Sequence, residues 1–285
     1  MPETMLPDDL ARLLPDDGVR RTLEVTPPAG RLVAPDPSMV TPGATDFERP
    51  VLWMSSQPVD GRVWSAFRDQ HPRSGLWPLL LLHDLADGDD DRPWADGELT
   101  PWPVAEIDEH DAAAFVAEEW SGWTEEADGD DQVFGLKDLE PFGRECPGLA
   151  PVAAVTEDPS AVADRFAREM AGRPAHLGLV AAGRGADALT VIGWLGPINR
   201  HETPPLSAML RSWEERFGVR VVAVGFDTLY LSVAAPPTTP EEALRVAAEH
   251  FVFCPDNIQQ GDADGTLRSY AERLVGANAW AFWWD

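Results

Sequence analysis

The feature that most constrains how this chain can fold is one strongly acidic segment. Between Asp84 and Asp131 there are 18 acidic residues and one basic residue, Arg92, so this segment carries −17 of the chain's net charge of −27. Carboxylates are seldom buried, because removing them from water is costly. The densest acidic stretches also contain glycine, which favours turns. We therefore expect its two densest clusters, Asp87–Asp91 and Glu125–Asp131, to form surface loops.

The negative net charge also indicates which kinds of molecule this protein can bind. Binding to a phosphate backbone relies on clustered Lys and Arg, so we expect no nucleic-acid partner. An acidic surface instead favours a basic protein partner, because complementary charge speeds and orients the encounter.

The sequence predicts a cytoplasmic protein. Its first residues contain neither the basic start nor the apolar stretch of a secretory signal. The longest apolar run, Leu76–Leu82, has seven residues, whereas a membrane-spanning helix needs about 20. We therefore expect no membrane partner. The two cysteines, Cys146 and Cys254, are too few for a disulfide framework.

Residues 1–148 are expected to form an α+β region that is rich in tryptophan and interrupted by proline. Six prolines between residues 27 and 50 exclude long regular elements there. Short buried strands are predicted at 51–54 and 77–82, and a helix at 111–120. The composition becomes ordinary near residue 148, where we place the boundary with a C-terminal domain, residues 149–285.

The C-terminal domain contains an apparent internal repeat. Each copy consists of a predicted helix followed by two predicted strands, and the Gly-Ala-Asp-Ala-Leu of residues 185–189 corresponds to the Gly-Phe-Asp-Thr-Leu of residues 225–229. Two such units resemble a split βαβ arrangement, an antiparallel sheet with helices on one face. The predicted helices are 159–170 and 206–217, and the predicted strands are 177–181, 188–194, 219–224 and 228–234.

Clear signals mark the last elements. Thr239 precedes Pro240 and two glutamates, which predicts the start of a helix running to about Phe253. Another helix is expected at 266–274. The aromatic stretch 279–285 is expected to be a strand with Trp280, Phe282 and Trp284 on one side, covered on both faces or lining a cavity.

Several of these motifs together resemble a known family. They include Arg-Ser-Trp-Glu at 211–214, the turn at 225–229, Glu-His-Phe-Val-Phe-Cys-Pro-Asp at 249–256 and the closing Trp-Trp-Asp at 283–285. This combination resembles a bacterial family of domains of unknown function, the one numbered 4253, over roughly residues 176–285. The family implies a domain and no reaction.

The strongest candidate for chemistry is the segment containing His250, Cys254 and Asp256. On a helix, His250 and Cys254 would lie on one face, as a nucleophile and base or as two metal ligands. Pro255 disturbs this geometry, and a buried structural role explains both residues equally simply. A candidate pocket nearby would include Asn199, Asp227, Trp283, Trp284 and Asp285.

Two other motifs indicate loops. Acids in residues 87–98 match a calcium loop at positions 1, 3, 5 and 12, but Arg92 replaces its required glycine. Gly183-Arg184-Gly185 is too short for a phosphate motif, so we expect a hairpin turn. No cofactor motif is present.

Two functions are compatible with these observations. One is a non-enzymatic binding protein, inhibitor-like or immunity-like, that uses its acidic surface. The alternative is a small-molecule enzyme, a hydrolase or transferase, with a site around His250, Cys254 and Asp256.

Overall fold

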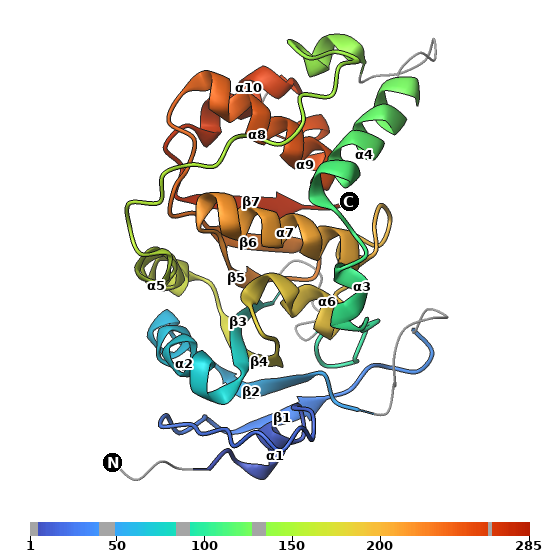
Figure 1. Ribbon diagram of the computed structural model, residues 1–285. Helices are drawn as coiled ribbons and strands as arrows, with labels where there is room; N and C mark the ends of the chain where they lie inside the picture. Colours follow the sequence, from blue (N-terminus) through green and yellow to red (C-terminus); the bar gives the residue numbers. More distant parts are fainter. Residues whose placement is uncertain (1–4, 40–48, 84–91, 127–134, 262–263) are drawn as a thin grey trace.

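One seven-stranded open sheet runs through the molecule, with strand order β1-β2-β4-β3-β5-β6-β7 (Figure 1). The computed structural model describes residues 5–39, 49–83, 92–126, 135–261 and 264–285. The strands are β1 (Gly30–Val33), β2 (Leu52–Pro58), β3 (Leu76–Leu82), β4 (Ala175–Ala181), β5 (Arg220–Val224), β6 (Thr228–Ser232) and β7 (Ala279–Trp283).

The helices lie around this sheet. The first four are α1 (Asp8–Ala11), α2 (Gly61–Ser74), α3 (Val104–Ile107) and α4 (Ala112–Glu126). The next four are α5 (Pro159–Glu169), α6 (Ala188–Ile192), α7 (Thr203–Phe217) and α8 (Pro240–Phe253). The last two are α9 (Asp256–Gln259) and α10 (Leu267–Leu274). Short 3₁₀ turns are η1 (Leu136–Leu139), η2 (Met170–Gly172) and η3 (Gly185–Asp187).

Strands from both sides of residue 148 share the sheet. β3 pairs antiparallel with β4 along its whole length and parallel with β5 on its other side. The remaining neighbours are antiparallel. The carboxyl ends of β3 and β5 therefore meet at the same edge of the sheet, beside the amino end of β4.

The predicted α+β class is confirmed, as is the second helix–strand–strand unit, which is α7, β5 and β6. Thr239 and Glu242 form the capping box at the start of α8, as its sequence indicates. β7 covers 279–283, with Trp280 and Phe282 buried on one face and Trp283, 37% exposed, on the other. Of the two alternatives for this strand, coverage on both faces is therefore wrong.

The predicted strand at 188–194 is wrong, because residues 188–192 form helix α6. Leu189, Thr190 and Ile192 are fully buried and Val191 is partly buried, so no exposed polar residue marks a helical period in the sequence. Gly193 ends α6 with a φ of 68°, the left-handed conformation that glycine adopts readily. The loop Gly183-Arg184-Gly185 therefore leads into η3 and α6, and the hairpin prediction is also wrong.

Most tryptophans of the first half anchor the core, as large aromatics usually do. Trp64 and Trp94 are fully buried and donate their indole N–H groups to Pro78 O and Leu82 O at 2.8 and 3.3 Å. Trp77 donates to Val221 O of β5 at 3.1 Å. These bonds attach side chains of the first half to β3 and β5.

Helices α2 and α5 pack closely along one flank of the sheet (Figure 1). A Cβ atom at Gly61 would lie 2.0 Å from the carbonyl oxygen of Ala167. Glycine at this position therefore permits the close approach of the two helices. From the end of α5 the chain continues through η2 to Arg173, so the packing of α5 helps to position Arg173.

An ion pair between Arg216 of α7 and Glu249 of α8 lies in the core, where Glu249 is fully buried. The guanidinium Nη1 and Nη2 donate to Glu249 Oε1 and Oε2 at 2.9 and 2.5 Å. Trp213 Nε1 and Ala150 N donate to the same carboxylate, each at 2.6 Å. Arg216 also donates to Ala150 O at 2.9 Å. The pair therefore fixes the segment between η1 and α5, which crosses α8 (Figure 1).

Two further findings concern the surface. Among the described residues, no helix is both long enough and apolar enough to cross a membrane. The acidic cluster 87–91, which is also the first part of the calcium-loop motif, lies outside the described residues, as do residues 127–131 of the second cluster. Glu125 and Glu126 are the last residues of helix α4, so the loop prediction is wrong for these two.

Removing Arg216 should strongly destabilise the fold. We expect Arg216→Leu to lower the free energy of unfolding by about 3–5 kcal/mol, because it leaves the Glu249 carboxylate buried without its counter-charge. Urea denaturation followed by circular dichroism measures this change.

The control is Arg165→Leu, which breaks a surface ion pair with Glu157 whose side chains are 44% and 52% exposed. Such pairs contribute at most about 1 kcal/mol. Equal losses in the two variants would contradict the role assigned to the buried pair.

Candidate functional site

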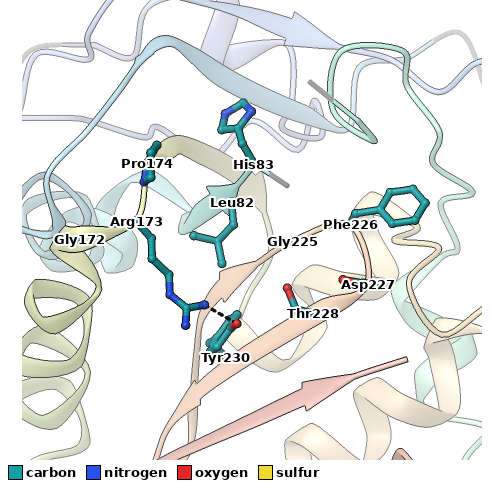
Figure 2. A pocket seen from close by; sticks show the side chains of 10 residues that line it. All are labelled: Leu82, His83, Gly172, Arg173, Pro174, Gly225, Phe226, Asp227, Thr228 and Tyr230. Carbon is teal, nitrogen blue, oxygen red and sulfur yellow. Dashed lines mark hydrogen bonds between the residues drawn. The ribbon is translucent and has the colours of Figure 1, made fainter. Parts of the chain in front are cut away.

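A pocket of about 310 Å³ lies where β3 and β5 end and β4 begins (Figure 2). In open sheets, ligands often bind outside the carboxyl ends of parallel strands. The volume falls at the small end of the range for ligand sites, about 300–1,000 Å³. The lining residues are Leu82, His83, Gly172, Arg173, Pro174, Gly225, Phe226, Asp227, Thr228 and Tyr230.

Arg173 supplies a positive charge to this pocket. Its Nη1 donates to the Tyr230 hydroxyl, and its guanidinium carbon lies 4.9 Å from the centre of the Tyr230 ring. Within the described ranges, no carboxylate forms an ion pair with Arg173, whereas Arg68, Arg184 and others are paired with Asp or Glu. Its charge is therefore available to a ligand.

His83 follows β3 directly and forms part of the pocket wall. Its ring packs against that of His176, with the centroids 4.4 Å apart. His176 is buried, and its Nδ1 lies 2.5 Å from Ser55 O. The end of β3 is held in addition by the bond from Trp94 to Leu82 O.

The turn between β5 and β6 forms the opposite wall. Gly225 N donates to Thr228 O at 2.8 Å, which closes the turn. Trp194 Nε1 donates to Gly225 O and Phe226 O at 2.9 and 3.1 Å. Trp283 Nε1 donates to Asp227 Oδ2 at 2.9 Å. Two indoles therefore hold the turn in place.

The structure places His250 and Cys254 in the core with different partners. His250 Nδ1 lies 2.9 Å from the Tyr270 hydroxyl, and its ring packs among Trp213, Trp280 and Phe282. Cys254 Sγ donates to Trp283 O at 2.9 Å.

These surroundings oppose the ionised forms that catalysis would use. Burial lowers the pKa of His250 to about 3, with Arg216 adding to the effect. Burial raises the pKa of the Cys254 thiol to about 12. A thiol that stays protonated is a poor nucleophile and metal ligand, so the geometry favours the structural interpretation of both residues.

The remaining candidates gather around the end of β7. Asp256 Oδ2 accepts from Asp285 N at 3.3 Å, and Asn199 Nδ2 donates to Asp285 O at 3.0 Å. Trp284 is buried against Trp194, with ring centroids 5.3 Å apart. Of the residues proposed from sequence, Asp227 lines the pocket of Figure 2, and Asn199 lines a separate pocket of about 210 Å³.

Asn257 completes this arrangement. Its Nδ2 donates to Ala281 O at 2.7 Å, and its Oδ1 accepts from Trp283 N at 3.0 Å. One side-chain amide thus bonds the backbone of β7 on both sides of Phe282. The segment 250–257 therefore positions β7, and through Trp283 it supports Asp227.

The described residues contain no group of three or more His, Cys, Asp or Glu side chains arranged to hold a metal ion. The chemical character of the pocket is therefore set by its charged side chains, Arg173 and Asp227.

Comparison with protein families identifies the part of the chain that builds the turn and β7. Residues 176–285 match the family described as Domain of unknown function (DUF4253). This confirms the resemblance inferred from the sequence. No curated protein and no solved structure gives a significant match. The DUF4253 part contributes Gly225 through Tyr230 to the pocket, whereas Leu82, His83 and Arg173 lie before it.

Sequence reasoning missed Arg173, His83 and Tyr230. The available signal was weak: His83 directly follows a predicted buried strand, and Arg173 lies between a predicted helix and a predicted strand. Their proximity depends on the strand order β4-β3-β5, which the sequence does not reveal.

The buried histidine should make stability depend on pH. Because the pKa of His250 in the folded chain is about 3, below the ordinary value of about 6.5, the unfolded chain binds an extra proton between these values. The folded chain is therefore not destabilised by His250 above pH 6.5, and its free energy of unfolding decreases as the pH falls below that value. We expect the free energy of unfolding to drop between pH 6 and pH 5 by about 1 kcal/mol more in the unmodified protein than in His250→Gln.

Urea titrations at the two pH values measure this difference. His110→Gln, which alters an exposed histidine, should keep the slope of the unmodified protein. If His250→Gln has that slope too, His250 is not the group responsible.

Proposed function

We propose that the pocket of Figure 2 binds a small organic molecule carrying a carboxylate or phosphate group, with Arg173 as the partner of that anion. The observation that carries the proposal is the Arg173 guanidinium, which faces a pocket and forms no ion pair with a described carboxylate.

Tyr230 supports this role by fixing the guanidinium in one orientation. The hydroxyl takes one N–H donor, and contact with the ring restrains the guanidinium plane. Donors remain for a carboxylate or phosphate, which a planar guanidinium binds in a two-pronged manner. An arginine held before binding loses less conformational entropy when the anion arrives.

The other walls indicate an organic ligand rather than a bare ion. Leu82 is buried in the pocket floor, and Phe226 is 38% exposed at the turn. Apolar walls with a few directed polar groups are typical of small-molecule sites. The function that we propose is therefore the binding of a small organic molecule.

Arg173→Met should weaken the binding of simple anions by about 10- to 100-fold, the equivalent of a charged hydrogen bond. Acetate and inorganic phosphate are titrated at pH 7.5 while the backbone amide signals of Gly225 and Thr228 are followed by NMR.

Arg62→Met, which removes an 82% exposed arginine side chain of α2, should bind both anions like the unmodified protein. The proposal is wrong if neither anion shifts these signals, or if Arg173→Met retains full affinity.

A second proposal concerns the acidic face of α3 and α4. Glu109 and Asp111, between the two helices, and Glu118 and Glu125 of α4 are exposed there, and residues 93–126 contain no Lys or Arg. We propose that this face contacts a basic protein partner, with the cytoplasm as the expected compartment. Complementary charge would orient the encounter and make it dependent on salt.

A lysine-rich peptide provides a test of this face. Changing Glu109, Glu118 and Glu125 to Gln should weaken the peptide's binding at low salt and flatten its salt dependence, as measured by fluorescence anisotropy. The matched control changes the exposed Glu169, Glu202 and Glu272 to Gln. Equal effects of the two triple variants would show that net charge alone acts, against a defined acidic face.

A further inference from the structure

We infer that the ligand of the pocket is a zwitterion, a small amino acid whose ammonium group meets Asp227 while its acidic group meets Arg173. The inference rests on the proposed function, and it adds the second pole of the ligand. Figure 2 shows Arg173, which follows η2, and Asp227, in the β5–β6 turn, on opposite sides of the pocket.

The Asp227 carboxylate is held in place by the strand that follows it in the sheet. Trp283 Nε1 donates to Asp227 Oδ2 at 2.9 Å, and Trp284 N donates to Asp227 O at 3.1 Å. The side chain of Asp227 is thus fixed by Trp283 of β7, and its backbone is fixed by Trp284, which follows β7. A carboxylate positioned before binding is what recognition of a cation requires.

The turn that carries Asp227 is fixed as well. Trp194 bonds two successive carbonyl oxygens, those of Gly225 and Phe226. The ring of Trp194 packs against that of Trp284. Trp194 bonds the turn and Trp284 N bonds Asp227 O, so this aromatic pair fixes the turn at two points. The negative side of the pocket therefore has a built framework that an incidental surface aspartate would lack.

The two charges together select among ligands. A simple carboxylate satisfies Arg173 but gains nothing from Asp227, and a simple amine does the reverse. A zwitterion of the right length satisfies both, and a dianion is repelled by Asp227. Specificity of this kind combines an attractive and a repulsive element. Thr228, beside Asp227 in Figure 2, offers a hydroxyl acceptor for a further ammonium proton.

Matched pairs of ligands test the inference. Glycine, β-alanine and 4-aminobutyrate are compared with acetate, propionate and butyrate, which have the same carbon chains without the amine. Dissociation constants are measured by NMR titration at pH 7.5. We expect at least one amino acid to bind about tenfold more tightly than its matched acid, the value of one charge-assisted hydrogen bond.

Asp227→Asn should remove this preference and leave the affinity for the simple acids unchanged or higher. Asparagine has the same shape and still offers an oxygen to Trp283 Nε1, so the turn should be retained. Trp283→Phe, which lacks the indole donor, should reduce the preference in part. Asp9→Asn, at an exposed position of α1, is the matched control and should preserve it.

The outcomes separate the two proposals. If the simple acids bind through Arg173 as tightly as the amino acids, or if Asp227→Asn keeps the preference, the zwitterion inference is overturned and the anion site stands. If neither series binds, the zwitterion inference is wrong, and if inorganic phosphate fails to bind as well, the anion site is wrong too.

Discussion

The buried ion pair between Arg216 and Glu249 is the constraint on which the rest of the structure depends. Its carboxylate accepts from α7, from the Trp213 indole and from the backbone of Ala150. A buried charge pair is tolerable only when its groups are satisfied together, which fixes their geometry. The pair thereby fixes where the connection from the first half passes, and so how the chain enters α5 and reaches Arg173. The pocket depends on a contact far from its walls.

Elements with local signals were predictable from the sequence. Helix α8 has its capping threonine and first-turn proline, α7 ends at Gly218, and the aromatic alternation of β7 appears directly in the chain. Helix α6 was not predictable, because four of its five residues are buried and its Thr-Val-Ile sequence is typical of a strand. The matching five-residue stretches at 185 and 225 occupy a helix start and a turn, so similar sequence here reflects different structure.

Some residues of the candidate site were likewise predictable from the sequence, and others were not. Asp227 was identifiable because its turn is conspicuous, and Trp283 because it closes an unusual motif. Arg173 and His83 become neighbours only through the pairing of β3 with β4 and β5, a long-range fact without a local signal. Conversely, His250 and Cys254 attracted attention as reactive residue types, yet their bonds to Tyr270 and to the backbone of β7 serve packing. A residue type alone does not distinguish chemistry from support.

The amide of Asn257 has a consequence for how the molecule behaves among its own copies. β7 is the last strand of the sheet, and unpaired backbone groups on an outer strand invite another chain to extend the sheet. Asn257 occupies Ala281 O and Trp283 N, and Cys254 occupies Trp283 O. Three backbone groups at the end of β7 therefore already have side-chain partners, and fewer groups at this border of the sheet remain for another strand to bond.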